Sequence, residues 1–265
     1  MDRTIDSIRH RYETSGRAKA IMTEIPRLIW TLWLQGWETA PPIVRACRAT
    51  WENRNPGWEV RALTQESLGE YRSVVPPIWP GIPRAAYSDL VRVNLLSRFG
   101  GVWADATVYC TRPLAGWIDD ATSSGFFAFR PAQPRMLSTW FLAARQDSYL
   151  LRAWADLANQ YWVDRTALGE YFWLHQLFAD ACSGDMQIRR CWDAVPHMPA
   201  GGPHLFVPQE IRLSWPLEDS TRARLLGAVD PVYKLSHRGP QEYPAGSVGD
   251  FLVRWAGTGR IRPTP

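Results

Sequence analysis

One stretch constrains the fold more than any other, because it reads as a helix, a double glycine and a short strand that ends in an acid. Residues 84–98 contain no helix breaker and carry apolar side chains at helical spacing. Gly100-Gly101 is typical of a helix C-terminus, because glycine adopts the left-handed conformation without a Cβ clash. The apolar residues 102–104 then predict a buried strand, with Asp105 at its carboxyl end.

Acidic residues at two positions of this stretch are candidates for chemistry. In open α/β sheets ligands bind outside the carboxyl ends of the strands, so we expect Asp105 to lie at a functional site. Asp89 and Arg92 are three residues apart, which places them on the same helix face. They form either an exposed ion pair, which contributes little, or part of a site. The order of the Asp/Arg helix, the double glycine and the terminal acid favours the second interpretation.

The flanking sequence alternates between strand and helix patterns. Residues 28–33 are an apolar run that predicts the first strand, and residues 58–63 are the predicted second strand. Between them, Pro41-Pro42 opens a predicted helix that ends near Trp51. Together with the stretch 84–105, this alternation predicts an α/β fold with a mainly parallel sheet flanked by helices.

The second half of the chain has a helical period. We expect a helical insertion over about residues 134–181, with helices over 137–144, 149–161 and 168–181. The tail after Arg238 is predicted to be rich in loops.

The length fits one large domain. We expect an N-terminal arm over residues 1–23 and a single domain over residues 24–265. The sequence shows neither the apolar core of a signal peptide nor a run long enough to cross a bilayer. We therefore expect a cytoplasmic protein, with peripheral association with a membrane left open.

Composition narrows the class of ligand. The net charge is +4, and Lys19 and Lys234 are the only lysines, so arginine supplies nearly all the positive charge. Arginine suits phosphate ligands, although a GC-rich genome would also favour arginine codons. The sequence lacks a long basic cluster, so we expect no nucleic-acid partner. Its four cysteines form no CxxC pair, which argues against a zinc site or a redox motif.

Six segments, in this order, resemble the capsular polysaccharide synthesis proteins, which are related to the mannosyltransferases and large clostridial toxin glucosyltransferases that carry a DxD motif. The resemblance covers about residues 24–238 and implies a GT-A-like, Rossmann-type fold. The segments are Ile25–Trp30 with Trp33 and Gly36; Pro41-Pro42 with Trp51, Asn55 and Pro56; Ser88–Arg92; Gly100–Thr107; Glu170-Tyr171-Phe172 with His175; and Tyr233–His237.

The resemblance implies contacts with a nucleotide-sugar donor. An aromatic residue after the first strand would stack on the base, with Trp33 as first candidate, Trp30 as second and Leu32 beside them. Each tryptophan could equally be a core residue. Asp89 would accept hydrogen bonds from the ribose or base, and Arg92 would lie near the sugar or the phosphates.

Asp105 matches the first acid of the DxD motif, but Thr107 stands where the second acid would be. The resemblance implies Mn²⁺ or Mg²⁺ as cofactor, bound by Asp105, Thr107 and His237, and the missing carboxylate puts tight binding in doubt. His237 could instead be structural. Lys234 and Arg238 would neutralise the leaving diphosphate.

Glu170 is the second catalytic candidate. In the resembling family an acid at this position lies near the donor sugar and the acceptor. Glu170 is expected to open a helix that contains His175, so it could instead complement the helix dipole.

The resulting hypothesis is a retaining glycosyltransferase that uses a nucleotide-diphosphate sugar, first of all a UDP-sugar. The acceptor would be a glycan, a lipid-linked molecule or a small natural product. The alternative is a catalytically weak protein that binds nucleotide sugars, because the second acid is missing. We expect Trp33, Asp89 and Asp105 to line one pocket, and we expect Asp89→Ala or Asp105→Ala to abolish transfer without loss of the fold.

Overall fold

A computed structural model describes residues 24–207 and 210–257, so the predicted N-terminal arm, residues 1–23, lies outside the described residues. The chain alternates between two compact units. Of the described residues, unit 1 holds 24–26, 68–103 and 119–198, and unit 2 holds 27–67, 104–118, 199–207 and 210–257. The expectation of one domain over residues 24–265 stays a prediction.

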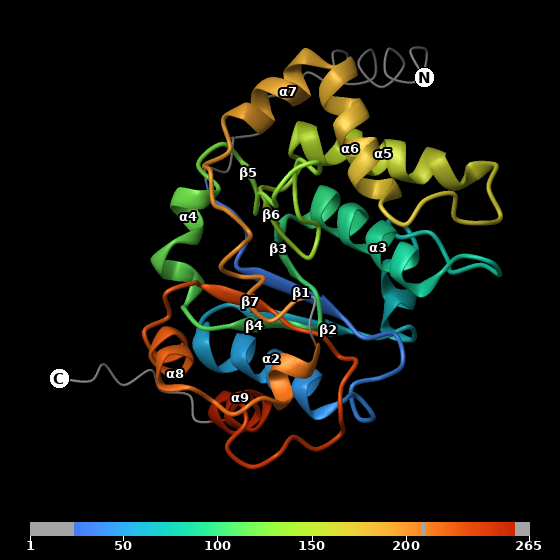
Figure 1. The fold of residues 1–265 in the computed structure, drawn as a ribbon. Coiled ribbons are helices and arrows are strands. Elements are labelled where there is room, and N and C mark those ends of the chain that lie inside the picture. The colour runs from blue at the N-terminus through green and yellow to red at the C-terminus, as the bar shows by residue number, and fades with distance from the viewer. Residues whose placement is uncertain (1–23, 208–209, 258–265) are drawn as a thin grey trace. The chain divides into compact units, whose positions relative to one another are not determined.

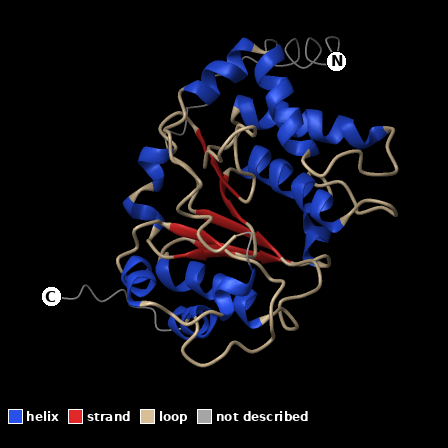
Figure 2. Ribbon diagram, viewed as in Figure 1, coloured by secondary structure: helices blue, strands red, loops and turns tan. Residues whose placement is uncertain are grey.

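The predicted fold class is confirmed, because the chain forms a mixed α/β structure with a mainly parallel sheet and flanking helices (Figure 1, Figure 2). Nine of the described elements lie in unit 1, and three of them (η1, β3 and α4) extend one residue past its boundaries. They are η1 (Ser67–Tyr71), α3 (Arg84–Phe99), β3 (Gly101–Ala104), α4 (Ile118–Ala121), β5 (Phe126–Ala128), β6 (Phe141–Ala144), α5 (Tyr149–Val163), α6 (Trp173–Gly184) and α7 (Met186–Asp193). Those of unit 2 are β1 (Leu28–Leu32), α2 (Pro42–Arg54), β2 (Glu59–Leu63), β4 (Val108–Cys110), η2 (Leu114–Gly116), η3 (Glu210–Ser214), α8 (Asp219–Leu226), β7 (Val232–Lys234) and α9 (Val248–Ala256).

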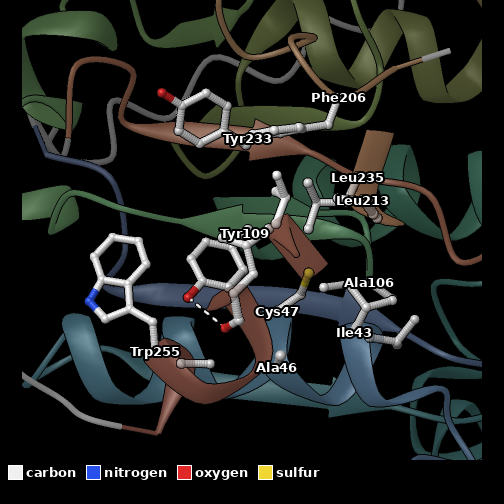
Figure 3. Packing of buried hydrophobic residues seen from close by; sticks show 14 of the residues in the cluster. Ile43, Ala46, Cys47, Ala106, Tyr109, Phe206, Leu213, Tyr233, Leu235 and Trp255 are labelled. Atoms are coloured by element: carbon white, nitrogen blue, oxygen red, sulfur yellow. Dashed lines mark hydrogen bonds between the residues drawn. The ribbon is translucent and has the colours of Figure 1, made fainter. Parts of the chain in front are cut away.

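In unit 2, helices α2, α8 and α9 and strands β4 and β7 contribute side chains to one apolar core. β1 and β2 are parallel, in a register that runs from Leu28 opposite Glu59 to Leu32 opposite Leu63, and β4 is antiparallel to β7. Tyr109 of β4 lies fully buried in this core, and its hydroxyl donates to the Leu252 carbonyl of α9 at 3.0 Å (Figure 3).

The prediction of a loop-rich tail is wrong over residues 248–256, because these residues form helix α9. The Ser247 side chain caps this helix, because its hydroxyl accepts the Asp250 N–H at 3.3 Å. Leu252 and Trp255 face the unit 2 core. The apolar residues of this segment therefore form the buried face of an amphipathic helix.

In unit 1, the predicted helix–glycine–strand stretch is confirmed as α3 and β3. Gly100 has a φ of 67°, and its N–H bonds the Leu96 carbonyl at 2.9 Å, which ends α3. A Cβ at Gly100 would also lie 2.6 Å from the Gln146 backbone nitrogen. Glycine is thus required both by the left-handed conformation and by the close approach of a second backbone segment.

The helical insertion is confirmed in part. Helices α5 and α6 match two predicted helices, and α5 lies beside α3 (Figure 1), where the Asn94 and Asn159 amides bond each other at 2.9 and 3.0 Å. The predicted helix over residues 137–144 is wrong, because Phe141–Ala144 form strand β6, antiparallel to β5. All four residues are buried, and a short, fully apolar run cannot be assigned to helix or strand by periodicity. Throughout the two described ranges, every helix is too short or too polar to cross a membrane.

Candidate functional site

A tight turn after β3 brings the two residues of the incomplete acid motif together in unit 2. The Val108 N–H bonds the Asp105 carbonyl at 2.8 Å and closes the turn. The Asp105 Oδ2 atom then lies 2.8 Å from Lys234 Nζ, and the Thr107 hydroxyl accepts from the same Nζ at 2.7 Å. One ammonium therefore bridges both motif positions, although it lies far away in the sequence.

The position of Lys234 is set by backbone pairing. Lys234 stands opposite Val108 in the β4–β7 register, and its N–H bonds the Pro203 carbonyl at 2.8 Å. The next N–H, that of Leu235, bonds the Thr107 carbonyl at 2.8 Å. The Lys234 and Asp105 side chains are 20% and 21% exposed, so both can contact a ligand while they remain shielded from bulk water.

The groups around Asp105 fit a divalent cation poorly. Mn²⁺ and Mg²⁺ prefer several carboxylate oxygens, whereas Asp105 is the one carboxylate of this motif and Thr107 is neutral. The Lys234 ammonium already occupies the position between them. His237, the third predicted ligand, is exposed, and its ring lies edge-on to Trp33 with centroids 5.4 Å apart. Among the residues that the structure describes, no three His, Cys, Asp or Glu side chains converge as a metal site requires.

The three predicted base-contacting residues differ in exposure. Trp33, directly after β1, is partly exposed and so remains available for stacking. Trp30 is fully buried, with the Arg61 guanidinium 5.4 Å from its ring centroid, which favours the core interpretation for this residue. Leu32 is 7% exposed. Arg238, predicted to contact phosphate, is exposed on the loop after β7.

In unit 1, the Asp89–Arg92 pair is not the exposed ion pair that the sequence also allowed. Asp89 Oδ1 lies 3.1 Å from Arg92 Nη1, and the two side chains are only 15% and 6% exposed. The Trp173 indole N–H donates to Asp89 Oδ2 at 3.1 Å. Arg92 also donates to the Thr139 carbonyl at 2.8 Å and to the Ser88 hydroxyl at 3.3 Å. Arg92 thus acts first as a support for Asp89, and its predicted contact with sugar or phosphate stays a prediction.

Glu170 lies just before helix α6, and His175 lies in the first turn of that helix; both belong to unit 1. The helix begins at Trp173, so Glu170 does not open it, and the expectation of a glutamate in its first turn is wrong. The reason is that residues 170–172 form a turn in which the Glu170 carbonyl accepts the Trp173 N–H at 3.3 Å. Glu170 is exposed, which leaves its predicted role untested. Burial, followed by the charges of Arg92 and Arg135, lowers the pKa of His175 from 6.5 to about 4, so its ring is neutral at pH 7.

Two features could not be found from the sequence. Trp173 is separated from Asp89 by 84 positions, and nothing in either segment signals their hydrogen bond. Unit 1 also contains a cavity of about 630 Å³ that none of the predicted site residues lines. Its walls include Arg72, Val75, Trp79, Leu90, Asn159 and Trp162. Because Trp33 and Asp105 belong to unit 2 and Asp89 to unit 1, the expectation that they line one pocket stays a prediction.

The sequence matches the model of a family described as capsular polysaccharide synthesis protein over residues 2–242. It is 30% identical over 167 residues to O-glycosyltransferase PaGT of Phomopsis amygdali, a match that covers 55% of this chain and 41% of that protein. It is 27% identical over 149 residues to inositol phosphoceramide mannosyltransferase 1 of Schizosaccharomyces pombe, with 52% of this chain and 44% of that protein covered. The chain thus spans less than half the length of these relatives.

Two solved structures are similar at low sequence identity. The apo form of the glycosyltransferase GlyE of Streptococcus pneumoniae TIGR4 matches with a TM-score of 0.44 and 10% identity, over 90% of this chain and 61% of that chain. The PaToxG glycosyltransferase matches with a TM-score of 0.41 and 12% identity, over 71% of this chain and 81% of that chain.

Proposed function

The chain belongs to the capsular polysaccharide synthesis protein family, and on this premise we propose that it is a glycosyltransferase that uses a nucleotide-diphosphate sugar. The glycosyltransferase and mannosyltransferase relatives support this proposal. The matches cover only 41% and 44% of these two relatives, so their full activity is attributed to this chain as a proposal.

The observation that carries the proposal is the charged pair at the end of β3. A leaving nucleoside diphosphate gains negative charge as the bond to the sugar breaks, and an enzyme accelerates this step by holding positive charge where that charge develops. Lys234 supplies a partly exposed ammonium there, and Asp105 and Thr107 fix its position at 2.8 and 2.7 Å. Trp33, in the same unit and partly exposed, is the proposed stacking surface for the base.

The proposed reaction retains the anomeric configuration. The bond between the sugar C1 and the diphosphate oxygen breaks while an acceptor hydroxyl attacks C1 from the same face. The hydroxyl proton passes to the departing diphosphate oxygen, so the products are the glycoside and the nucleoside diphosphate. In this scheme Asp89 binds donor hydroxyls and Glu170 orients the sugar or the acceptor, and no protein nucleophile is required.

The identity of the donor and the class of acceptor are also proposed. UDP-sugars are the first donors to test. A relative named O-glycosyltransferase supports a hydroxyl acceptor, carried by a glycan, a lipid-linked molecule or a small natural product. A lipid-linked acceptor would bring the protein to a membrane surface from the cytoplasm.

A second candidate function is binding of nucleotide sugars with little turnover. The observation that favours it is Thr107, which replaces a carboxylate that metal-dependent transfer would use. The two candidates differ in whether a bound donor is consumed.

A donor screen by mass spectrometry, with acceptor mixtures and with water as acceptor, tests both functions. We expect one nucleotide sugar to be consumed, and we expect Asp105→Asn to reduce the rate about 10²- to 10³-fold, the range for loss of one key electrostatic group. Asp193→Asn is the control, since it alters an exposed ion pair with Arg189. Binding of a donor without any transfer or hydrolysis would favour the second function, and normal turnover by Asp105→Asn would refute the role of Asp105.

A further inference from the structure

We propose that the Lys234 ammonium takes the place of a divalent cation between Asp105 and Thr107, so that the protein binds the diphosphate of its donor without a metal ion. The diphosphate part of this inference rests on the proposed function. Its first part, that this position holds an ammonium and not a metal, stands on the geometry alone.

The ammonium contacts the two residues that the motif would offer to a metal. Lys234 Nζ lies 2.8 Å from Asp105 Oδ2 and 2.7 Å from Thr107 Oγ1. An ammonium has three N–H donors, and these two contacts use two of them. The third can donate to a phosphate oxygen, as a metal ion would bind that oxygen through a free coordination position.

The charges around this position balance with lysine and not with a metal. Asp105 carries one negative charge, Thr107 carries none, and Lys234 carries one positive charge, so the three side chains together are neutral. A divalent ion would add two positive charges next to the ammonium, and a single carboxylate does not offset them. The threonine that weakens a metal site is therefore the residue that suits an ammonium.

The choice of lysine in an arginine-rich chain points the same way. Only two of the 30 Lys and Arg residues are lysines, and one of them is Lys234. Lysine presents a compact point charge with donors in three directions, whereas arginine presents a planar fork. A compact charge can occupy the position of a metal ion between the Asp105 carboxylate and the Thr107 hydroxyl.

The backbone holds this arrangement in place. Lys234 is paired with Val108, three residues after Asp105, and the N–H groups of Lys234 and Leu235 bond the Pro203 and Thr107 carbonyls, each at 2.8 Å. The side-chain stem therefore starts from a fixed point, and the ammonium is pre-organised for an incoming anion.

Direct binding measurements on the full chain test the inference. Mn²⁺ alone is titrated into the wild-type protein and free Mn²⁺ is read by electron paramagnetic resonance. UDP and GDP are titrated by calorimetry in EDTA and in Mn²⁺. We expect no Mn²⁺ binding at micromolar concentration and equal nucleotide affinity in the two buffers. Lys234→Met should weaken nucleotide binding about 10- to 100-fold, the effect of losing a hydrogen bond to a charged group.

Arg254→Met is the matched control for Lys234→Met, because it removes a positive charge from an ion pair in the same unit whose arginine is 72% exposed. A designed gain of function adds a second test. Thr107→Asp combined with Lys234→Ala restores two carboxylates and removes the ammonium, so this double variant should bind Mn²⁺ at least 10-fold more tightly than the wild type. Melting temperatures show whether each variant is folded.

Three outcomes would contradict the inference, and one of them also concerns the proposed function. Tight binding of Mn²⁺ to the wild type, or nucleotide binding that EDTA abolishes, would overturn the inference and leave glycosyl transfer intact. Both measurements use the wild type, so they decide the matter even if a variant fails to fold. If neither UDP nor GDP binds in any buffer, the diphosphate part of the inference fails together with the proposed donor class. In that case the Mn²⁺ titration still shows whether the position between Asp105 and Thr107 excludes a metal ion.

Discussion

The Asp89 carboxylate lies 3.1 Å from the Arg92 guanidinium and accepts from the Trp173 indole N–H, also at 3.1 Å, within unit 1. Both members of the ion pair are largely buried. Loss of one member of a buried pair leaves the other charge without its counterion, which costs far more than the loss of an exposed pair. At the residue scale, Asp89 is therefore structural as well as a candidate ligand contact.

This burial changes what Asp89→Ala is expected to do. The sequence suggested that the variant would keep its fold, but we now expect its free energy of unfolding to fall by about 3–5 kcal/mol, because buried Arg92 loses its counterion. Adding Arg92→Met should restore part of the loss. Urea denaturation measures both effects, with Asp193→Ala as the control for an exposed pair. An unchanged urea midpoint for Asp89→Ala would contradict the structural role.

His175 makes stability depend on pH. Burial lowers its folded-state pKa to about 4, against 6.5 in the unfolded chain, and its Nδ1 atom is buried without a hydrogen-bond partner among the described residues. Below pH 6.5 the unfolded chain binds a proton that the folded protein excludes. The contribution of His175 to stability is thus intact above that pH and falls as the pH drops towards 4, by up to about 3 kcal/mol.

We expect His175→Gln to remove this pH dependence. The difference in the free energy of unfolding between pH 7 and pH 4.5 should be smaller in the variant than in the wild type, because glutamine does not titrate. Urea midpoints at the two pH values measure it. His197→Gln, at an exposed position in the same unit, serves as the control. Equal pH dependence of the His175 variant and the wild type would show that His175 titrates normally.

At the scale of elements, helix α9 shows how packing overrides helix propensity. Gly249 lies inside this helix, where helix propensity by itself favours alanine over glycine by about 1 kcal/mol. A Cβ at position 249, however, would lie 2.3 Å from Cδ1 and 2.4 Å from Cγ of Tyr243. Cγ is the ring atom that is bonded to Cβ, so the clash involves the base of the ring and not the far end of a flexible side chain. The glycine is therefore required by a neighbouring loop and not by the helix itself.

We expect Gly249→Ala to destabilise the protein by about 1–3 kcal/mol, the usual cost of overpacking, despite the better helix former. Gly257→Ala is the matched control at the end of the same helix, because its Cβ would meet only the Arg254 carbonyl, at 3.8 Å, among the residues that the structure describes. Combining Gly249→Ala with Tyr243→Ala should relieve the clash. Thermal unfolding compares the variants, and a higher melting temperature for Gly249→Ala would show that propensity decides at this position.

At the scale of the whole molecule, the four cysteines report on how far each unit opens. All four are free thiols, and three of them are buried. Burial raises the pKa of Cys110, in unit 2, and of Cys182, in unit 1, to about 12, and it also raises the pKa of Cys47. The thiolate is the reactive form, so these three groups are protected both by their high pKa and by their lack of access.

We expect one thiol, that of the partly exposed Cys191, to react first with a disulfide reagent at pH 8 in the native protein. The other three should react only after opening, and all four should react at once in concentrated guanidinium. Cys191→Ser should abolish the fast phase. Fast labelling of Cys47 or Cys110 in native buffer would mean that unit 2 opens far more readily than its buried core implies.

Local patterns were sufficient for the first helices and strands of the chain and for α5 and α6. Alternation of patterns predicted β1, α2, β2, α3 and β3 close to their observed bounds. The sequence failed at β6 and α9. Phe141–Ala144 is apolar throughout, so only its pairing with β5 makes it a strand. The amphipathic face of α9 has meaning only because the unit 2 core lies against it.

The sequence by itself determined the α/β class, the glycine stop after α3, and the placement of Asp105 at a strand end, because these depend on backbone conformation within short segments. Only the tertiary structure decided the partners of the candidate residues. The contact of Lys234 with Asp105 and Thr107, and that of Trp173 with Asp89, join segments that lie far apart in the sequence. Such contacts depend on strand register and helix packing, which no local pattern encodes.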